Sequence, residues 1–387
     1  MDDMQTPPVA GGEQQRNLQD IAPPMILDEL RKGVLGQNTA LRFVSVALFK
    51  HTTGKVPGNI LLIGNSGTGK TTIMNNIQRM YHDVPEYAPF RAMTIINANL
   101  LVDAERMEFQ PERLLSAVEQ RARGLLGSRP TPDALRETME RATICIDEID
   151  KMSSIVAGKP NPLGVVLQQG LLTLMEGEMV AYKTYAWEDG EEKQVTINVD
   201  TRHMMFICGG AFEGLYDQVY FRVVSPSSGE KLTSQAITTA DGQVRIETRF
   251  ALTDFLKPED LFEYGMVPQF MSRFDNVVLL RDLDVPVLKE ILLHSLDSPY
   301  NRSKRYFEVM NIQLEIDDLA AALIAEDAEK NIRTGARALR TVFGKIINNL
   351  EFDPWQHPGL EVLEGGGHRL VITPEMARRA ISPRNGG

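Results

Sequence analysis

The stretch Gly64-Asn65-Ser66-Gly67-Thr68-Gly69-Lys70-Thr71 decides the fold, because it matches the pattern GxxxxGK[ST] over its full length. The apolar run NILLI at 59–63 precedes it, and the helix-forming run TTIMNNIQRM at 71–80 follows it. A glycine-rich turn between a strand and a helix lets backbone amides surround phosphate groups, and the helix presents its positive end to them. The stretch therefore predicts a nucleotide-binding loop in an α/β domain.

The residue types inside this loop predict which groups contact ATP and its magnesium ion. We expect Lys70 to reach the β- and γ-phosphates and the Thr71 hydroxyl to bind Mg²⁺. The expected nucleotide contacts come from eight consecutive residues: Asn65, Ser66, Gly67, Thr68, Gly69, Lys70, Thr71 and Thr72.

A second motif, ATICIDE at 142–148, supplies two adjacent carboxylates after an apolar run. Ligands of open α/β folds sit at the carboxyl ends of the strands, which is where Asp147 and Glu148 would lie. Asp147 is suited to hold the hydrated Mg²⁺. Glu148 is suited to orient and deprotonate the attacking water. The two motifs together predict ATP hydrolysis.

Strand-like apolar runs alternate with helical patterns through the first two thirds of the chain. The runs are NILLIG at 59–64, AMTIINA at 92–98, ATICIDE at 142–148, HMMFICGG at 203–210 and NVVLL at 276–280. Nearly continuous apolar strands separated by helices are typical of a parallel sheet that is covered on both faces. The fold class is therefore α/β, with a P-loop NTPase sheet between helices.

The organisation of the chain follows from its changes in pattern. Residues 1–24 are rich in Pro, Gly, Gln and Asp and are expected to form a disordered tail. Residues 25–284 form the large α/β domain, in which 181–200 has the alternation of a hairpin and 225–249 reads as a polar exposed loop. Residues 285–387 form a small helical domain. Its main helix carries an apolar stripe: Leu339, Val342, Phe343, Ile346, Ile347 and Leu350.

Composition narrows the class of protein. The 387 residues carry a formal net charge of −11, which lowers the expectation of a nucleic-acid motor. No apolar run approaches the roughly 18 residues of a membrane helix, and no secretory signal is apparent, so we expect a cytoplasmic protein without a membrane partner. The two cysteines, Cys145 and Cys208, lie in apolar runs and are expected to be buried and unpaired.

Two arginines lie at positions where they could assist phosphoryl transfer. Arg273 is in MVPQFMSRFDN, just before the last apolar strand, and Arg337 is in TGARALR, at the start of the helix with the apolar stripe. Positioned positive charge stabilises the transition state of phosphoryl transfer. By residue type alone, a solvated or ion-paired arginine is the more common role for each.

Several motifs together resemble the ClpX family of AAA+ protein unfoldases. They are IDEIDK, FICGGAFEGL, KPEDLFEYGMVPQFMSRF and TGARALR, in the order of that family, over roughly residues 25–350. The resemblance implies a large AAA+ domain followed by a small lid domain, and assembly into a homo-hexamer. It also implies that Arg273 reaches the γ-phosphate of a neighbouring subunit, that Arg337 is the sensor of the lid, and that Val34 and Leu35 pack around the adenine.

The sequence departs from the ClpX pattern in three places. The zinc-binding N-terminal module is missing, and 225–249 lacks the Ile- or Leu-Gly-Phe tripeptide with which the family docks its peptidase, ClpP. The segment DAERMEFQPE at 103–112 replaces the Gly-Tyr-Val-Gly pore loop that grips substrates. Phe109 is the best remaining candidate for that grip and Met107 the second, although a core position is equally compatible with either residue.

Three functions fit these observations. The first is an ATP-dependent protein unfoldase or remodeller that acts on a protein substrate or a dedicated partner without ClpP. The second is an ATP-gated scaffold or sensor ring that does not translocate a substrate. The altered pore segment favours it, whereas the complete catalytic set argues against it: Asp147, Glu148, Arg273 and Arg337. The third, a DNA-dependent motor, is disfavoured by the net charge of −11.

Overall fold

The computed structural model describes residues 21–55, 58–156, 158–226, 229–230, 232–238, 244–330 and 334–381. Most of the predicted tail, residues 1–20, lies outside the described residues. The first helix, α1 (Pro23–Arg31), begins two residues earlier than the predicted boundary, and Ile21 is already buried. Residues 23 and 24, which the sequence assigned to the tail, therefore belong to a helix.

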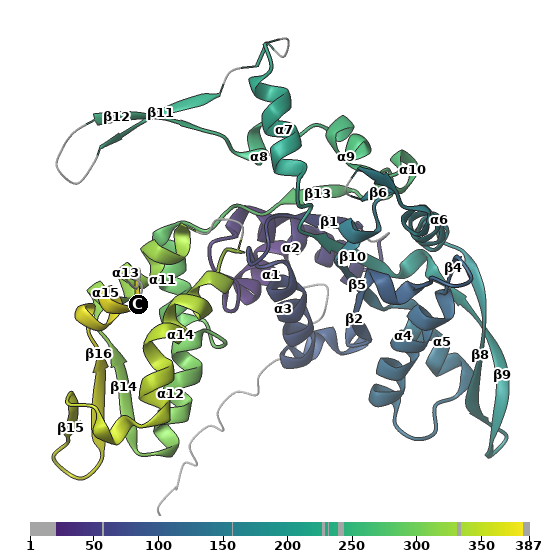
Figure 1. Ribbon diagram of the computed structural model, residues 1–387. Helices are drawn as coiled ribbons and strands as arrows, with labels where there is room; N and C mark the ends of the chain where they lie inside the picture. The colour runs from purple at the N-terminus through teal and green to yellow at the C-terminus, as the bar shows by residue number, and fades with distance from the viewer. Residues whose placement is uncertain are drawn as a thin grey trace, which may run out of the picture.

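A five-stranded parallel sheet forms the centre of the molecule (Figure 1). Its strands are β1 (Ile60–Ile63), β2 (Met93–Asn97), β5 (Thr143–Asp147), β10 (Met205–Gly210) and β13 (Asn276–Leu279). Their order is β13-β1-β10-β5-β2, and every neighbouring pair is parallel. The five predicted strands and their parallel arrangement are confirmed.

Successive residues of each strand enter two separate cores, one on each face of the sheet. Ile60 and Leu62 of β1 pack with one layer of helices, whereas Leu61 and Ile63 pack with the other. The first layer contains α1, α2 (Asn38–Thr52) and α3 (Lys70–Asp83). The second contains α4 (Pro111–Leu126), α5 (Pro132–Glu140), α6 (Pro162–Glu176) and α7 (Leu215–Val224).

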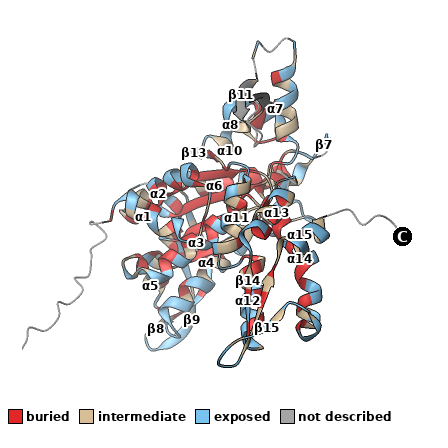
Figure 2. Cartoon of the chain, turned by 90° about the vertical axis from the view of Figure 1, so that its left-hand side faces the viewer, coloured by how far each residue is buried: buried red, intermediate tan, exposed pale blue. Residues whose placement is uncertain are grey.

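Burial on both faces explains why β1 is apolar throughout and why the other strands of the sheet are mostly apolar (Figure 2). The cysteines follow the same rule, since Cys145 of β5 and Cys208 of β10 are both buried and free of disulfide bonds, as predicted.

Two longer hairpins extend from the body. The predicted hairpin at 181–200 is confirmed as β8 (Met179–Glu188) paired with β9 (Glu191–Asp200). The segment 225–249 was predicted as a loop, and this is wrong for two stretches of it, because β11 (Thr233–Thr238) pairs with β12 (Val244–Arg249). The two strands are antiparallel. A segment of largely polar residues can therefore still form paired strands.

Short elements complete this part of the chain. The helices are α8 (Leu252–Phe255), α9 (Pro258–Tyr264) and α10 (Pro268–Met271). The strands are β3 (Val102–Asp103), β4 (Glu108–Phe109), β6 (Ile155–Val156) and β7 (Lys159–Pro160).

A third hydrophobic core begins at Leu283 and belongs to the C-terminal region. Its helices are α11 (Val285–His294), α12 (Pro299–Val309), α13 (Asp318–Glu329), α14 (Arg337–Phe352) and α15 (Pro374–Ile381). All six residues of the predicted apolar stripe on α14 are buried in it.

This region also contains a three-stranded sheet that the helical spacing did not predict. The strands are β14 (Ile312–Ile316), β15 (Leu360–Val362) and β16 (His368–Ile372). Leu314 and Leu370 of this sheet pack into the same core as α14, so helices and sheet form one unit, here called the lid. In the described part of the chain, no helix combines the length and apolar character needed to cross a membrane.

Candidate nucleotide site

The glycine-rich loop connects the end of β1 to the start of α3. Gly67 and Gly69 adopt left-handed backbone conformations, with φ of +77° and +109°. Such angles are unfavourable for residues with a Cβ atom, so they let the loop turn tightly and start α3 at Lys70. The amino end of α3 consequently points into a cavity of about 1190 Å³ between the sheet and the lid.

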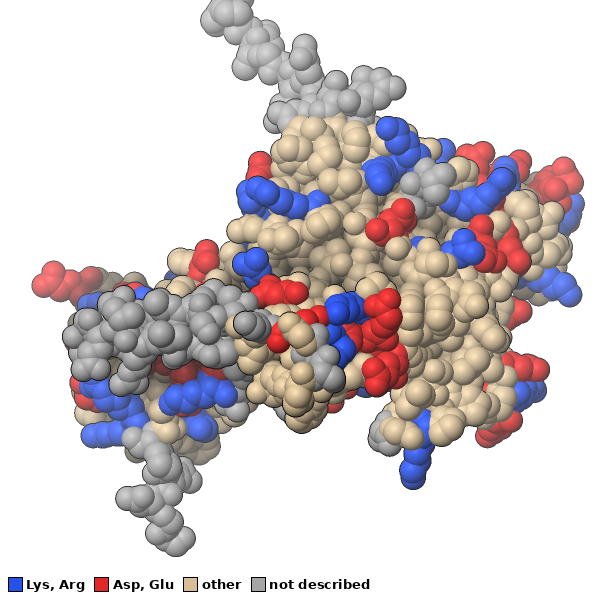
Figure 3. All heavy atoms as spheres, turned by 90° about the horizontal axis from the view of Figure 1, so that it is seen from above, with Lys and Arg blue, Asp and Glu red and all other residues tan. Residues whose placement is uncertain are grey.

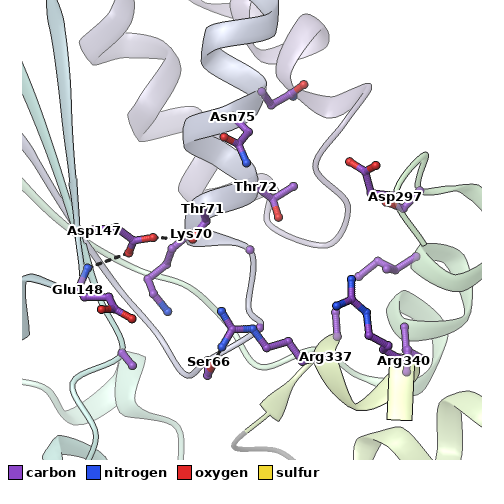
Figure 4. Close-up of a pocket in the computed structure, with 18 of the residues that line it drawn as sticks. Ser66, Lys70, Thr71, Thr72, Asn75, Asp147, Glu148, Asp297, Arg337 and Arg340 are labelled. Carbon is purple, nitrogen blue, oxygen red and sulfur yellow. Dashed lines mark hydrogen bonds between the residues drawn. The ribbon is translucent and has the colours of Figure 1, made fainter. Parts of the chain in front are cut away.

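The cavity brings together most of the predicted site residues (Figure 4). Those that line it are Leu35, Ser66, Gly67, Gly69, Lys70, Thr71, Thr72, Asp147, Glu148 and Arg337. Val34, Asn65, Thr68 and Arg273 are not part of the lining. Val34 is buried in the core that contains α1 and α2, so only Leu35 of the predicted adenine pair faces the cavity.

Lys70 is held inside the loop by backbone carbonyl groups. Its Nζ atom donates hydrogen bonds to the carbonyl oxygens of Gly64 and Asn65, the latter at 2.9 Å. Burial lowers the pKa of Lys70, and the nearby carboxylates of Asp147 and Asp150 oppose that shift. The ammonium group thus lies inside the loop. When a nucleotide binds, it can donate a hydrogen bond to a phosphate oxygen in place of one of these carbonyl oxygens.

Thr71 and Asp147, the two predicted magnesium ligands, contact each other directly. The Thr71 hydroxyl donates to Asp147 Oδ2 at 2.7 Å. Mg²⁺ prefers oxygen ligands and usually takes one or two from the protein, with phosphates and waters completing the octahedron. Both oxygen atoms fit that ion, and among the described residues no cluster of three or more His, Cys, Asp or Glu offers an alternative metal site.

Glu148 is held by two residues to which the sequence analysis assigned no role. Its Oε2 atom accepts a hydrogen bond from Asn97 Nδ2 at 2.6 Å and lies 2.7 Å from Lys151 Nζ. The bonds from Lys151 and Asn97 lower the pKa of Glu148, so its carboxylate is ionised at neutral pH. Glu148 also has a left-handed backbone, with φ of +58°.

Strand register is the signal that could have identified Asn97. It ends β2 and lies opposite Asp147, the last residue of the neighbouring strand β5. Carboxyl ends of adjacent parallel strands meet at one edge of a sheet, so a polar residue there lies near the acidic pair.

Asp150 is a buried carboxylate beside the same edge. It accepts hydrogen bonds from the backbone N–H groups of Ala211 and Phe212, each at 3.2 Å. Burial raises the pKa of Asp150, while these two bonds favour its ionised form. Its geometry therefore fixes the turn that follows β10, in which Phe212 has a left-handed backbone with φ of +52°.

Arg337 reaches the glycine-rich loop from the lid. Its Nη1 atom donates to Ser66 Oγ at 2.6 Å, and Figure 4 shows its guanidinium group directed toward Ser66. Arg340, three residues further along α14, also lines the cavity. Positive charge from the lid is thus placed opposite the amino end of α3.

Arg273 lies outside this cavity, on the surface that precedes β13. It forms an ion pair with Glu176 at the end of α6, and both side chains are exposed. Within one chain, Arg273 is therefore not brought together with Lys70, Asp147 and Glu148.

The predicted pore segment folds as a small turn between β3 and β4. Phe109 packs against α6, because a Cβ atom placed on Gly170 would lie 2.3 Å from the Phe109 ring. Met107 occupies the turn itself, with φ of +55°, and 42% of its surface is exposed. Phe109, the first candidate for the grip, therefore has a packing contact on α6, and Met107, the second candidate, is the apolar side chain that the turn presents to solvent. The gripping role of either residue stays a prediction.

Comparison with known proteins agrees with the geometry of the cavity. Residues 55–277 match the family described as AAA domain (Cdc48 subfamily). The chain is 28% identical over 360 residues to the ATP-dependent Clp protease ATP-binding subunit ClpX of Bacteroides thetaiotaomicron, which covers 88% of this chain and 80% of the relative. It is 27% identical over 361 residues to the protein of the same name from Porphyromonas gingivalis, with the same coverage.

Proposed function

Because the chain belongs to the family of AAA domains (Cdc48 subfamily) and is a ClpX-like AAA+ ATPase, we propose that it remodels proteins with energy from ATP. It assembles into a homo-hexameric ring in the cytoplasm, and each ATP is hydrolysed at a site shared by two neighbouring subunits. Its target is a protein substrate or a dedicated protein partner.

The residues of the cavity divide the work of hydrolysis. Mg²⁺, when bound, would supply positive charge against the phosphates. Thr71 and Asp147 would hold that ion with their hydroxyl and carboxylate oxygen atoms. Lys70 binds the β- and γ-phosphates, and Leu35 contacts the base. The ionised carboxylate of Glu148, released from Lys151 or Asn97, accepts a proton from the attacking water.

The proposal of a site shared by two subunits rests on the position of Arg273, which lies outside the cavity. The arginine is exposed and does not line the cavity of its own chain, so a contact with phosphate requires a second subunit. Its ion pair with Glu176 is on the surface, and exposed pairs contribute only about 0–1 kcal/mol. Exchange of Glu176 for a γ-phosphate therefore meets little resistance.

We further propose that the chain works without ClpP and without nucleic acid. The segment 225–249 contains no Ile- or Leu-Gly-Phe tripeptide. On the face seen from above, Lys and Arg alternate with Asp and Glu and do not form a single basic patch (Figure 3). A nucleic-acid motor needs clustered positive charge to hold the phosphate backbone.

A second candidate function is an ATP-gated scaffold ring that moves no substrate. The packing of Phe109 against Gly170 favours it, because that ring is not available to push on a polypeptide. The two candidates differ in what stimulates hydrolysis.

The test measures ATPase activity of the purified chain alone, with a denatured protein, and with single- or double-stranded DNA. Stimulation by denatured protein alone is expected for the remodeller. A basal rate that none of these ligands changes supports the scaffold, and stimulation by DNA contradicts both. Capture of cellular proteins on Glu148→Gln, loaded with ATP, then identifies the partner, with Lys70→Ala as the control that cannot load.

A further inference from the structure

Two glycines at the contact between the lid and the nucleotide loop are not required by the phosphate-binding pattern. The pattern GxxxxGK[ST] fixes Gly64 and Gly69 but leaves position 67 open. Gly67 has φ of +77°, and Gly335, in the segment that precedes α14, has φ of +49°. Both angles favour glycine, but the surroundings of the two residues impose a second and stricter condition.

Each of the two glycines leaves room for the backbone of the other segment. A Cβ atom on Gly67 would lie 2.2 Å from the carbonyl oxygen of Thr334. A Cβ atom on Gly335 would lie 2.8 Å from both the carbonyl carbon and the carbonyl oxygen of Gly67. These neighbours are backbone atoms, which cannot turn aside as a flexible side chain does. A methyl group at either position would force the lid and the loop apart.

Polar contacts on both sides of this glycine pair hold the same two segments together. The backbone N–H of Ala336 donates to the carbonyl oxygen of Gly67 at 3.1 Å. The next residue, Arg337, donates from Nη1 to Ser66 Oγ at 2.6 Å. Two successive lid residues thus bind two successive loop residues, so the starting point of the Arg337 side chain is fixed relative to the loop.

We propose that the backbone contact between Gly335 and Gly67 positions Arg337 for phosphoryl transfer. This inference rests on the proposed function, in which Arg337 acts on the bound nucleotide. Gly335 is a positioning residue, since it touches the loop and acts through the arginine that follows two residues later. A misplacement of about 1 Å in such a site can reduce turnover about 100-fold.

A simpler explanation is that Gly335 only relieves backbone strain at a turn. The lid contains a matched control for this explanation, because Gly365, between β15 and β16, has φ of +106° and a Cβ atom added to it would meet no atom within 4 Å. Gly365→Ala therefore introduces the strain of a left-handed alanine without pushing on the loop. Any loss specific to Gly335→Ala comes from the contact.

The experiment compares kcat and KM for ATP in the wild type, Gly335→Ala, Gly365→Ala, Arg337→Ala and the double variant Gly335→Ala with Arg337→Ala. We expect Arg337→Ala to lower kcat about 100-fold, as for loss of one preorganised donor, and Gly335→Ala to lower it to a similar degree. The double variant should be no slower than Arg337→Ala within about threefold, because both changes remove the same interaction. Gly365→Ala should retain the kcat and KM of the wild type.

The proposal would be overturned if the reduction of kcat in the double variant equalled the product of the two single reductions. An unchanged kcat in a folded Gly335→Ala would overturn it as well. Wild-type turnover in Arg337→Ala would overturn the proposal at a different point, because it would remove the proposed role of Arg337, and it would leave the backbone contact itself to be judged separately. Hydrogen exchange of the Ala336 amide in the wild-type chain tests the backbone contact directly. This measurement does not depend on whether Gly335→Ala folds. Protection of this amide is expected, and exchange at the rate of an open loop contradicts the contact.

Discussion

The nucleotide cavity and the turn between β3 and β4 differ in how their functional candidates are held. In the cavity, polar side chains from separate elements contact one another: Thr71 with Asp147, Glu148 with Asn97, and Arg337 with Ser66. In the turn, Phe109 packs on α6 while Met107 extends into solvent. A preorganised site can perform chemistry with little rearrangement, whereas a turn with a single exposed apolar side chain can only offer a weak contact.

The largest expected effect in the cavity is that of Glu148→Gln. The amide cannot accept a proton from water, so hydrolysis should fall about 100- to 10,000-fold while ATP binding persists. Glu137→Gln, an identical change on the outer surface of α5, is the control and should hydrolyse ATP normally. Turnover near the wild-type rate in Glu148→Gln would assign the activation of water to another group.

In the turn, Phe109→Ala should act on stability and not on substrate contact. Removal of a partly buried ring that packs against Gly170 is expected to cost about 2–3 kcal/mol and to lower the melting temperature. Met107→Ala is the matched change on the same turn and should leave the melting temperature unchanged, because its side chain is exposed. If Met107→Ala melted earlier and Phe109→Ala did not, the comparison of the two side chains would be reversed.

Lys70→Ala tests whether the cavity binds the ground state of the nucleotide. Loss of a charge-assisted contact to phosphate should raise the Kd for ATP about 10- to 100-fold, which calorimetry can measure. Lys304→Ala, at an exposed position of α12, should bind ATP as the wild type does. Equal affinities in the two variants would contradict the assignment of the phosphate-binding loop.

Lys151→Met should produce the smallest change, a shift in the pH dependence of kcat. The Lys151 ammonium is the largest cause of the lowered pKa of Glu148, so its removal raises that pKa. Because Glu148 must be ionised to accept a proton, the acidic limb of the kcat profile should move to higher pH. A limb that stays in place or moves to lower pH would show that Lys151 does not control Glu148.

The sequence predicted the sheet well because most residues of its strands are buried, on one face of the sheet or the other. Apolar runs such as ILLI of β1 and ICI within β5 are typical of strands in a parallel sheet that is covered on both faces. The lid sheet and the β11–β12 pair escaped prediction for the opposite reason. Polar residues interrupt the strands IQLEI (β14) and HRLVI (β16), and β11 and β12 are largely polar, so none of the four forms a continuous apolar run. Their pairing also depends on partners that local periodicity does not reveal.

The candidate site was predictable where a motif requires particular atoms, as at Lys70, Thr71, Asp147 and Glu148. Contacts that join distant segments left no local pattern: Asn97 reaches Glu148 across neighbouring strands, and Gly335 meets Gly67 across the lid. The position of Phe109 could not be predicted either, since an apolar residue in an acidic segment suits a surface grip and a packing contact equally. Its burial depends on the absence of a side chain at Gly170, far along the chain.

The central claim, an ATP site shared between subunits, is tested most directly by mixing two inactive variants. Arg273→Ala keeps its own Glu148, and Glu148→Gln keeps its own Arg273, so a ring that contains both has some interfaces with a complete set of groups. We expect each variant alone to hydrolyse ATP poorly and their equimolar mixture to recover measurable ATPase activity. Activity that stays at the level of the separate variants at every mixing ratio would contradict the shared site.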